Sequence, residues 1–214
     1  KVVDLNITNG AVIVLEPESG EILAMVGSRD YNEPNFGKVN VVTQGLRQPG
    51  SAIKPVTYVT ALKKGYTAAH LLLDTRTEFP GASKEKPYIP VNYDGKYHGP
   101  VLMRYALGNS LNVPAVKMLA QVGLENMLET AYQMGFTTLK PTAENLSKFG
   151  LAVTLGGGEV RLIEMAGAYA AFANGGLKVE PTAILKVENQ EGKVLEEVKP
   201  TKGKQVLTQG EAFI

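Results

Sequence analysis

Residues 47–55 read Arg47-Gln48-Pro49-Gly50-Ser51-Ala52-Ile53-Lys54-Pro55, a turn followed by the start of an apolar segment. The Pro-Gly pair favours a turn, and the apolar spacing over residues 53–62 predicts a largely buried helix over 51–64. Residues three apart lie on one face of a helix, so we expect the Ser51 hydroxyl and the Lys54 amine to meet. Burial would lower the pKa of Lys54 and allow it to activate the serine. The stretch predicts a nucleophilic serine, and an ordinary helix cap is the alternative.

A second Ser-x-x-Lys copy occurs at Ser83-Lys84-Glu85-Lys86. It lies in a charged stretch between Gly81 and Pro87, with no apolar period after it, so it predicts a solvated loop. The four-letter pattern is weak by itself, and its surroundings favour Ser51 as the candidate nucleophile.

Composition is that of a soluble globular chain. Its 214 residues can form one large domain or two packed lobes. The 22 basic and 21 acidic residues give a net charge of +1, which offers no reason to expect nucleic acid as a partner. There is no cysteine, and His70 and His98 lack a metal-ligand spacing, so we expect no metal and no cofactor. The sequence has no Gly-x-Ser-x-Gly elbow of an α/β-hydrolase.

The sequence predicts both strands and helices. Runs rich in β-branched residues around Pro and Gly predict two hairpins, at 11–27 and 183–198. A loop is expected over 28–50, and an irregular but packed loop over 66–99. Apolar periods with start and stop signals predict further helices at about 100–108, 114–121, 124–134, 160–173 and from 208 onward.

Ser110-Leu111-Asn112 separates two of these helices. In a short extended loop, residues two apart project to the same side, so the Ser110 hydroxyl and the Asn112 amide could face one pocket. The alternative is a turn that caps the following helix.

A glycine triplet, Gly156-Gly157-Gly158, precedes the helix expected at 160–173. It lacks the Gly-Lys-Ser/Thr ending of a phosphate-binding loop, so we interpret it as a close approach of backbone to helix. The helix itself is expected to have an apolar face made of Leu162, Met165, Ala166, Tyr169 and Phe172.

Taken together, these segments resemble the transpeptidase domain of the penicillin-binding proteins, most of all the bifunctional, class A type. Residues 47–55 resemble the active-serine segment of that family, which the Ser-x-x-Lys set characterises. The resemblance extends over nearly the whole chain, through the opening strands at 11–27, the second motif at 106–117 and the later segment at 157–176.

The resemblance implies a mixed α+β fold, that of the penicillin-binding proteins and serine β-lactamases. Such a fold has an antiparallel sheet flanked by helices plus an all-helical lobe, here with its C-terminal strands missing. Residues 1–214 would form a single incomplete transpeptidase domain. Its sheet lobe would comprise about 1–65 and 150–214, and its helical lobe about 66–149.

The resemblance also implies a reaction, peptidoglycan D,D-transpeptidation at the extracytoplasmic face of the bacterial cell membrane. Ser51 would form the acyl-enzyme, Lys54 would take its proton, Ser110 would relay a proton to the leaving amine, and Asn112 would hold the substrate's amide. The implied partners are peptidoglycan stem peptides and β-lactam antibiotics.

The sequence departs from the family at its third motif, Lys-Thr/Ser-Gly, which is missing. Thr201-Lys202-Gly203 has the letters in the wrong order. Without the strands that carry this motif, the hairpin at 11–27 would have an unpaired edge, so we expect a C-terminal fragment or a second chain to complete the fold. The alternative functions are a β-lactam sensor and an inactive scaffold. A serine β-lactamase is a further alternative, but it would need a segment that activates water, and the sequence has none suited to this.

Overall fold

The computed structural model describes residues 7–83, 86–198 and 203–214. The chain divides into two compact units. The first comprises residues 1–47, 133–137 and 160–213, and the second comprises residues 48–132 and 138–159 together with Ile214. The helix that follows Ser51 belongs to the second unit.

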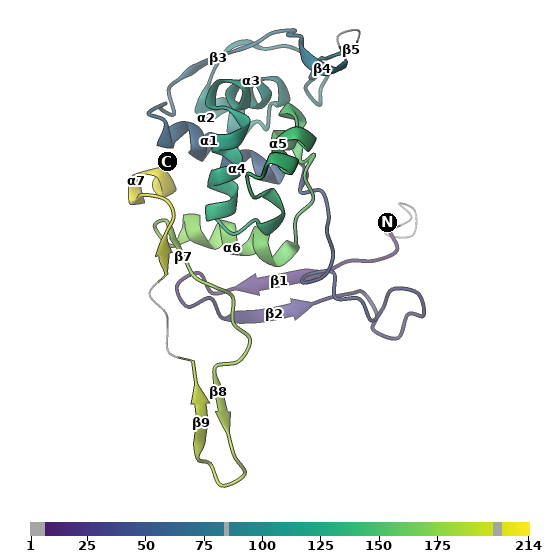
Figure 1. The fold of residues 1–214 in the computed structure, drawn as a ribbon, viewed down its shortest axis with the longest axis vertical. Helices are drawn as coiled ribbons and strands as arrows, with labels where there is room; N and C mark the ends of the chain where they lie inside the picture. Colours follow the sequence, from purple (N-terminus) through teal and green to yellow (C-terminus); the bar gives the residue numbers. More distant parts are fainter. Residues whose placement is uncertain (1–6, 84–85, 199–202) are drawn as a thin grey trace. The chain divides into compact units, whose positions relative to one another are not determined.

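A β-hairpin opens the first unit, as the sequence predicts (Figure 1). Strands β1 (Val12–Leu15) and β2 (Ile22–Val26) pair antiparallel, with Val12 opposite Val26 and Val14 opposite Ala24. Helix α6 (Leu162–Ala173) packs against β1. The side chains of Val12, Val14 and Val26 are 55%, 44% and 51% exposed, so an apolar face of the hairpin is open to solvent in this unit.

The buried face of α6 differs from the predicted one. Its buried residues are Gly167, Ala168 and Ala171, whereas Leu162 and Tyr169 of the predicted face are exposed. The most buried residues of α6 are therefore not those of its predicted apolar face, of which Met165, Ala166 and Phe172 are half-buried. Because Glu164 is the only charged residue of this helix, its apolar pattern does not distinguish one side from another, and the small residues permit the closest packing.

The C-terminal part of the first unit contains the predicted second hairpin and last helix, and also two short strands that were not predicted. Strands β8 (Lys186–Glu188) and β9 (Val194–Glu197) form the second predicted hairpin, and α7 (Gln209–Phe213) is the predicted last helix. Strand β7 (Leu177–Lys178), before the hairpin, pairs with β10 (Lys204–Gln205), after it. The rejected Thr201-Lys202-Gly203 lies outside the described residues except for its glycine.

Helices form the core of the second unit. A short 3₁₀ helix, η1 (Gly50–Ile53), leads into α1 (Lys54–Lys63), which packs against α3 (Asn112–Val122) and α2 (Met103–Gly108). The predicted helix over 51–64 is confirmed, with a tighter first turn. Helix α4 (Leu124–Gln133), η2 (Thr137–Leu139), α5 (Ala143–Lys148) and η3 (Leu151–Leu155) follow in the chain. Fully buried apolar side chains in these elements include Ile53, Val56, Val116, Met118, Leu119 and Leu128.

The segment expected to be irregular contains strands. Strand β3 (Leu71–Asp74) pairs with β6 (Gly99–Leu102), and β4 (Phe79–Ser83) pairs with β5 (Lys86–Tyr88). Pro100, predicted to open a helix, instead lies in β6 opposite Leu73. This prediction was wrong because proline, which lacks an N–H, also fits a strand in a two-stranded sheet. Helix α2 begins at Met103, later than the predicted start near residue 100, and ends at Gly108, as predicted.

Two smaller expectations concern this unit. Helix α3 begins at Asn112 rather than at Pro114, which is its third residue. Of the second Ser-x-x-Lys copy, residues 84–85 lie outside the described residues, while Ser83 ends β4 and Lys86 begins β5. Within the described chain, no helix is both long and apolar enough to serve as a membrane span.

Candidate active site

Ser51 lies in a tight turn before a buried helix. Gly50 adopts a positive φ of 58°, a left-handed conformation that glycine adopts without strain, and η1 begins at this residue. The Ser51 side chain is exposed, and its carbonyl accepts from the Lys54 N–H at the start of α1. Pro55 is tolerated because it lies in the first turn of α1.

Lys54 is a charged residue whose side chain is buried in the second unit. Its side chain is 1% exposed, yet the amine has three oxygen partners. Nζ donates to the Ser110 carbonyl at 2.6 Å, to Ser110 Oγ at 3.1 Å and to Asn112 Oδ1 at 2.7 Å. An ammonium group has three N–H donors, so these contacts use all of them. Burial lowers the pKa of Lys54 to about 8.

The Ser110–Asn112 loop meets Lys54 through a different geometry from the predicted extended one. Ser110 has a φ of +52°, which non-glycine residues rarely adopt, and Asn112 is already the first residue of α3. The N–H groups of Ser110 and Leu111 close α2 by donating to Leu107 and Ala106 carbonyls. The prediction of an extended loop is wrong, but the two side chains still converge on one amine.

Three of the four predicted site residues therefore form one hydrogen-bonded cluster: Lys54, Ser110 and Asn112. Ser51 lies outside it, because no hydrogen bond joins Ser51 Oγ to Lys54 Nζ in the described part of the chain. All four residues belong to the second unit.

A second polar cluster next to this one was not predicted. Asp74 is 0% exposed, and both of its carboxylate oxygens accept from Asn92 Nδ2, at 3.0 and 2.8 Å. The His98 N–H donates to Asp74 at 2.9 Å, and His98 Nδ1 lies 2.6 Å from the same carboxylate. The hydrogen bond to Asp74 raises the pKa of His98. No spacing in the sequence connects these residues, because β3 and the loop before β6 bring them together.

A pocket of about 380 Å³ adjoins the cluster on the Ser110 side. Its lining mixes amide, carboxylate and aromatic side chains: Asn92, Tyr93, Asp94, His98, Val101, Tyr105, Asn109, Ser110 and Leu111. Ser110 thus lies at the border of a cavity and contacts Lys54 as well.

Backbone packing supports the turn that presents Ser51. A Cβ at Gly156 would lie 2.5 Å from Gly50 Cα, so only glycine allows η3 to end against this turn. Buried Thr57 of α1 and Thr154 of η3 are joined by a hydrogen bond of 2.7 Å. The glycine triplet does make a close backbone approach, as predicted, but the neighbour of Gly156 is Gly50, the residue before Ser51, and not the helix that follows the triplet.

Comparison with known proteins agrees with this fold. The sequence profile of the penicillin-binding protein transpeptidase domain matches residues 10–212. The chain is 39% identical over 191 residues to penicillin-binding protein 1A of Aquifex aeolicus, covering 89% of this chain and 25% of that protein. It is also 39% identical over 201 residues to penicillin-binding protein 2D of Bacillus subtilis, covering 94% of this chain and 28% of that protein.

A solved structure has a similar fold. The crystal structure of penicillin-binding protein 1A from Haemophilus influenzae superposes with a TM-score of 0.81 at 33% identity, covering 91% of this chain and 28% of that one. The chain belongs to the family of penicillin-binding protein transpeptidase domains. The expected mixed α+β transpeptidase fold is confirmed. The chain spans about a quarter of the length of the curated relatives it matches.

Proposed function

We propose that this chain carries the nucleophile-bearing part of a penicillin-binding peptidoglycan D,D-transpeptidase that works through an acyl-enzyme on Ser51. The observation that carries the proposal is the buried Lys54 amine, whose pKa is lowered to about 8 and which is held by Ser110 and Asn112. An amine with such a pKa is available as a base near neutral pH. Membership of the transpeptidase family supports the reaction class.

In the proposed first step, neutral Lys54 takes the proton of Ser51, and Ser51 Oγ attacks the carbonyl carbon between two D-alanines. The carbon–nitrogen bond breaks, Ser110 relays a proton to the departing amine, and free D-alanine leaves an ester on Ser51. The Ser51 N–H, at the start of η1, supplies one donor to the developing oxyanion. A β-lactam would acylate the same hydroxyl by opening of its ring.

In the second step, the amine of a neighbouring stem peptide attacks the ester, and the carbon–oxygen bond breaks. Ser51 Oγ regains its proton and a cross-link remains. Asn112 would hold the substrate's amide: its Oδ1 accepts from Lys54, and one N–H of its side-chain amide donates to the Val91 carbonyl at 2.9 Å. The other N–H is the group assigned to the substrate.

We further propose that a segment outside these 214 residues, a C-terminal piece or a second chain, supplies the Lys-Thr/Ser-Gly strand. The support is the open apolar face of β1 and β2 at Val12, Val14 and Val26, since proteins cover or blunt such strand surfaces. The reaction would take place at the extracytoplasmic face of the bacterial cell membrane, where peptidoglycan is assembled.

Intact mass after incubation with benzylpenicillin tests the proposal. We expect the native chain to gain the mass of one penicillin and Ser51→Ala to gain none. Ser83→Ala, which removes the serine of the second Ser-x-x-Lys copy, is the matched control and should be labelled like the native chain. Labelling that survives in Ser51→Ala would contradict the assignment of an activated Ser51. No labelling of the native chain would show that these 214 residues by themselves form an incomplete site.

Turnover separates the alternative functions. A stable adduct with no loss of free penicillin agrees with a transpeptidase or a sensor, and cross-linking of a stem-peptide amine then identifies the transpeptidase. Rapid consumption of penicillin with no lasting adduct would instead indicate a β-lactamase.

A further inference from the structure

Asn92 is a buried amide whose orientation is fixed by its neighbours. It is 4% exposed. Its Nδ2 faces three acceptors, the two Asp74 oxygens at 3.0 and 2.8 Å and the Lys96 carbonyl at 2.8 Å. Its Oδ1 faces two donors, the N–H groups of Asn112 at 2.8 Å and Val113 at 3.2 Å. A flipped amide would face oxygen with oxygen and nitrogen with nitrogen, so only one orientation satisfies all partners.

The two donors are the first N–H groups of α3. A helix N-terminus needs acceptors for such groups, and the residue before α3, Leu111, makes no side-chain cap. Asn92 supplies that acceptor from 20 residues earlier in the chain. It thereby fixes the backbone of Asn112, the residue whose Oδ1 accepts from Lys54 at 2.7 Å.

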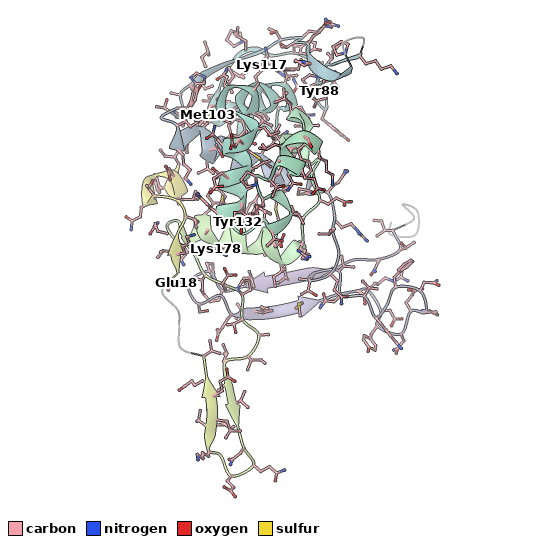
Figure 2. The ribbon with its side chains drawn as sticks, in the orientation of Figure 1. Glu18, Tyr88, Met103, Lys117, Tyr132 and Lys178 are labelled. Atoms are coloured by element: carbon pink, nitrogen blue, oxygen red, sulfur yellow. The ribbon has the colours of Figure 1, made fainter. Side chains whose placement is uncertain are left out.

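Asp74 in turn fixes Asn92. This buried carboxylate, the last residue of β3, gives Asn92 Nδ2 a partner that the opposite amide orientation would lack. Lys117 makes a second link between the same elements, because its Nζ donates from α3 to the Leu73 carbonyl at 2.5 Å and to Thr75 Oγ1 at 3.1 Å. Figure 2 labels Lys117 on α3.

We propose that Asp74 and Asn92 are a positioning pair, which sets the first turn of α3 so that Asn112 holds the Lys54 amine. Neither residue touches Lys54 directly, and each acts through the backbone of α3. The effect of the pair on acylation rests on the proposed function of Ser51, whereas its effect on the geometry of α3 does not.

Exchanging the two side chains tests the pair. Asn92→Asp places a carboxylate against the Asp74 carboxylate and the Lys96 carbonyl, and this repulsion displaces it. In the double variant Asp74→Asn/Asn92→Asp, the new amide at 74 can donate to the new carboxylate at 92, which can still accept from Asn112 and Val113. Asn126→Asp is the matched control, because Asn126 donates to the Val122 carbonyl away from the cluster.

The first measurement needs no enzyme activity. Native-state hydrogen exchange of the Asn112 and Val113 amides reports whether Asn92 accepts from them. We expect exchange to become about tenfold faster in Asn92→Asp, the equivalent of one lost hydrogen bond. In the double variant we expect it to slow again toward the native rate, with a remaining difference because the Lys96 carbonyl still lacks its donor. Exchange unchanged in Asn92→Asp, or equally fast in the double variant, would overturn the proposal.

The second measurement is the rate of acylation by benzylpenicillin in the same variants. A displacement of catalytic groups by about 1 Å can cost about 10²-fold, so we expect a loss approaching that size in Asn92→Asp and recovery in the double variant. A merely destabilising change would not be reversed by the exchange. A native rate in Asn92→Asp would overturn the catalytic part of the proposal.

Two outcomes keep the inference separate from the proposed function. If the native chain is not acylated, these 214 residues do not form a complete acylation site by themselves, and hydrogen exchange alone decides the pair. If Asn92→Asp does not fold, Asp74→Asn replaces it, since that variant removes the charge without adding a second carboxylate. We then expect the Asn112 and Val113 amides to exchange faster, and an unchanged rate would overturn the proposal.

Discussion

Lys54 combines a charged group with almost complete burial, and this combination determines its chemistry. With a pKa of about 8, the amine is neutral in roughly one molecule in ten at pH 7. The three oxygens that surround Nζ suit the ammonium form. In the mechanism that we propose, loss of a proton turns Lys54 into the base that activates Ser51.

Acylation should therefore accelerate with pH. We expect the rate of benzylpenicillin acylation to rise about tenfold between pH 7 and 9 and to level off above the pKa of Lys54. Rates measured across this range check it, with Lys54→Met as the control that removes the dependence. A flat profile would show that the neutral amine is not the base.

The same pKa has a consequence for stability. Since burial lowers the pKa in the folded chain, the folded state binds fewer protons than the unfolded state between about pH 8 and the unfolded value of about 10.4. The contribution of Lys54 to the free energy of unfolding should therefore increase as pH rises through that window. Urea unfolding at several pH values checks this, and Lys54→Met should lack the increase.

Tyr58 is a second residue whose burial has a measurable effect. It lies on α1, one turn after Lys54, and its hydroxyl has no hydrogen-bond partner within the described residues. Burial raises the pKa of this hydroxyl. An unpaired buried hydroxyl lowers stability, so Tyr58→Phe should raise the free energy of unfolding by about 1 kcal/mol.

Thermal and urea unfolding measure this change. The control is Tyr105→Phe, at an exposed ring, which should change stability by less than about 0.5 kcal/mol. A loss of stability in Tyr58→Phe would mean that the hydroxyl has a partner, such as a bound water.

At the scale of elements, local signals predicted more than long-range ones. The hairpin at 11–27 follows from its β-branched runs around Pro and Gly. The helix after Ser51 and the helix ending at Gly108 follow from apolar spacing and Gly or Asn stop signals. The strand at 99–102 was missed because proline is compatible both with the first turn of a helix and with a strand. Only the pairing of this segment with β3 decides between the two.

In the candidate site, too, residues within short motifs could be predicted, and residues brought together by long-range contacts could not. Ser51, Lys54, Ser110 and Asn112 could be selected from two short motifs. Asp74, Asn92 and His98 could not, because their contacts depend on how β3 and the loop before β6 fold together. The left-handed conformation of Ser110 was also beyond the sequence, since a serine there gives no signal of a positive φ.

Gly156 links two elements around the nucleophile and yields a prediction at this scale. Its φ of +94° and its approach to Gly50 both exclude a side chain. We expect Gly156→Ala to lower the free energy of unfolding by about 1–3 kcal/mol and to slow acylation of Ser51, because the turn that presents the serine must shift.

Gly150→Ala is the matched control, because an added Cβ at the start of η3 meets open space and the residue has no positive φ. Urea unfolding and penicillin labelling compare the two variants. If Gly156→Ala behaved like Gly150→Ala, the close approach would have no bearing on Ser51.

For the molecule as a whole, the short match to its relatives and the exposed apolar face of the β1–β2 hairpin have a common consequence. The chain matches only about a quarter of the length of its curated relatives, and its first unit leaves Val12, Val14 and Val26 exposed on one side of the β1–β2 hairpin. Exposed apolar strand surfaces promote association with other chains. The 214-residue chain should therefore self-associate as its concentration rises.

Replacing Val12, Val14 and Val26 together by Thr should reduce this association while changing the free energy of unfolding by no more than about 0.5 kcal/mol per site, since the side chains are largely solvated. Sedimentation velocity measures the association. Ile13→Thr is the control: Ile13 alternates with these residues and is half-buried, so it should lower stability by about 1 kcal/mol without reducing association. A chain that stays monomeric at all concentrations would remove the support for a completing segment, because the open face would then be stable in water by itself.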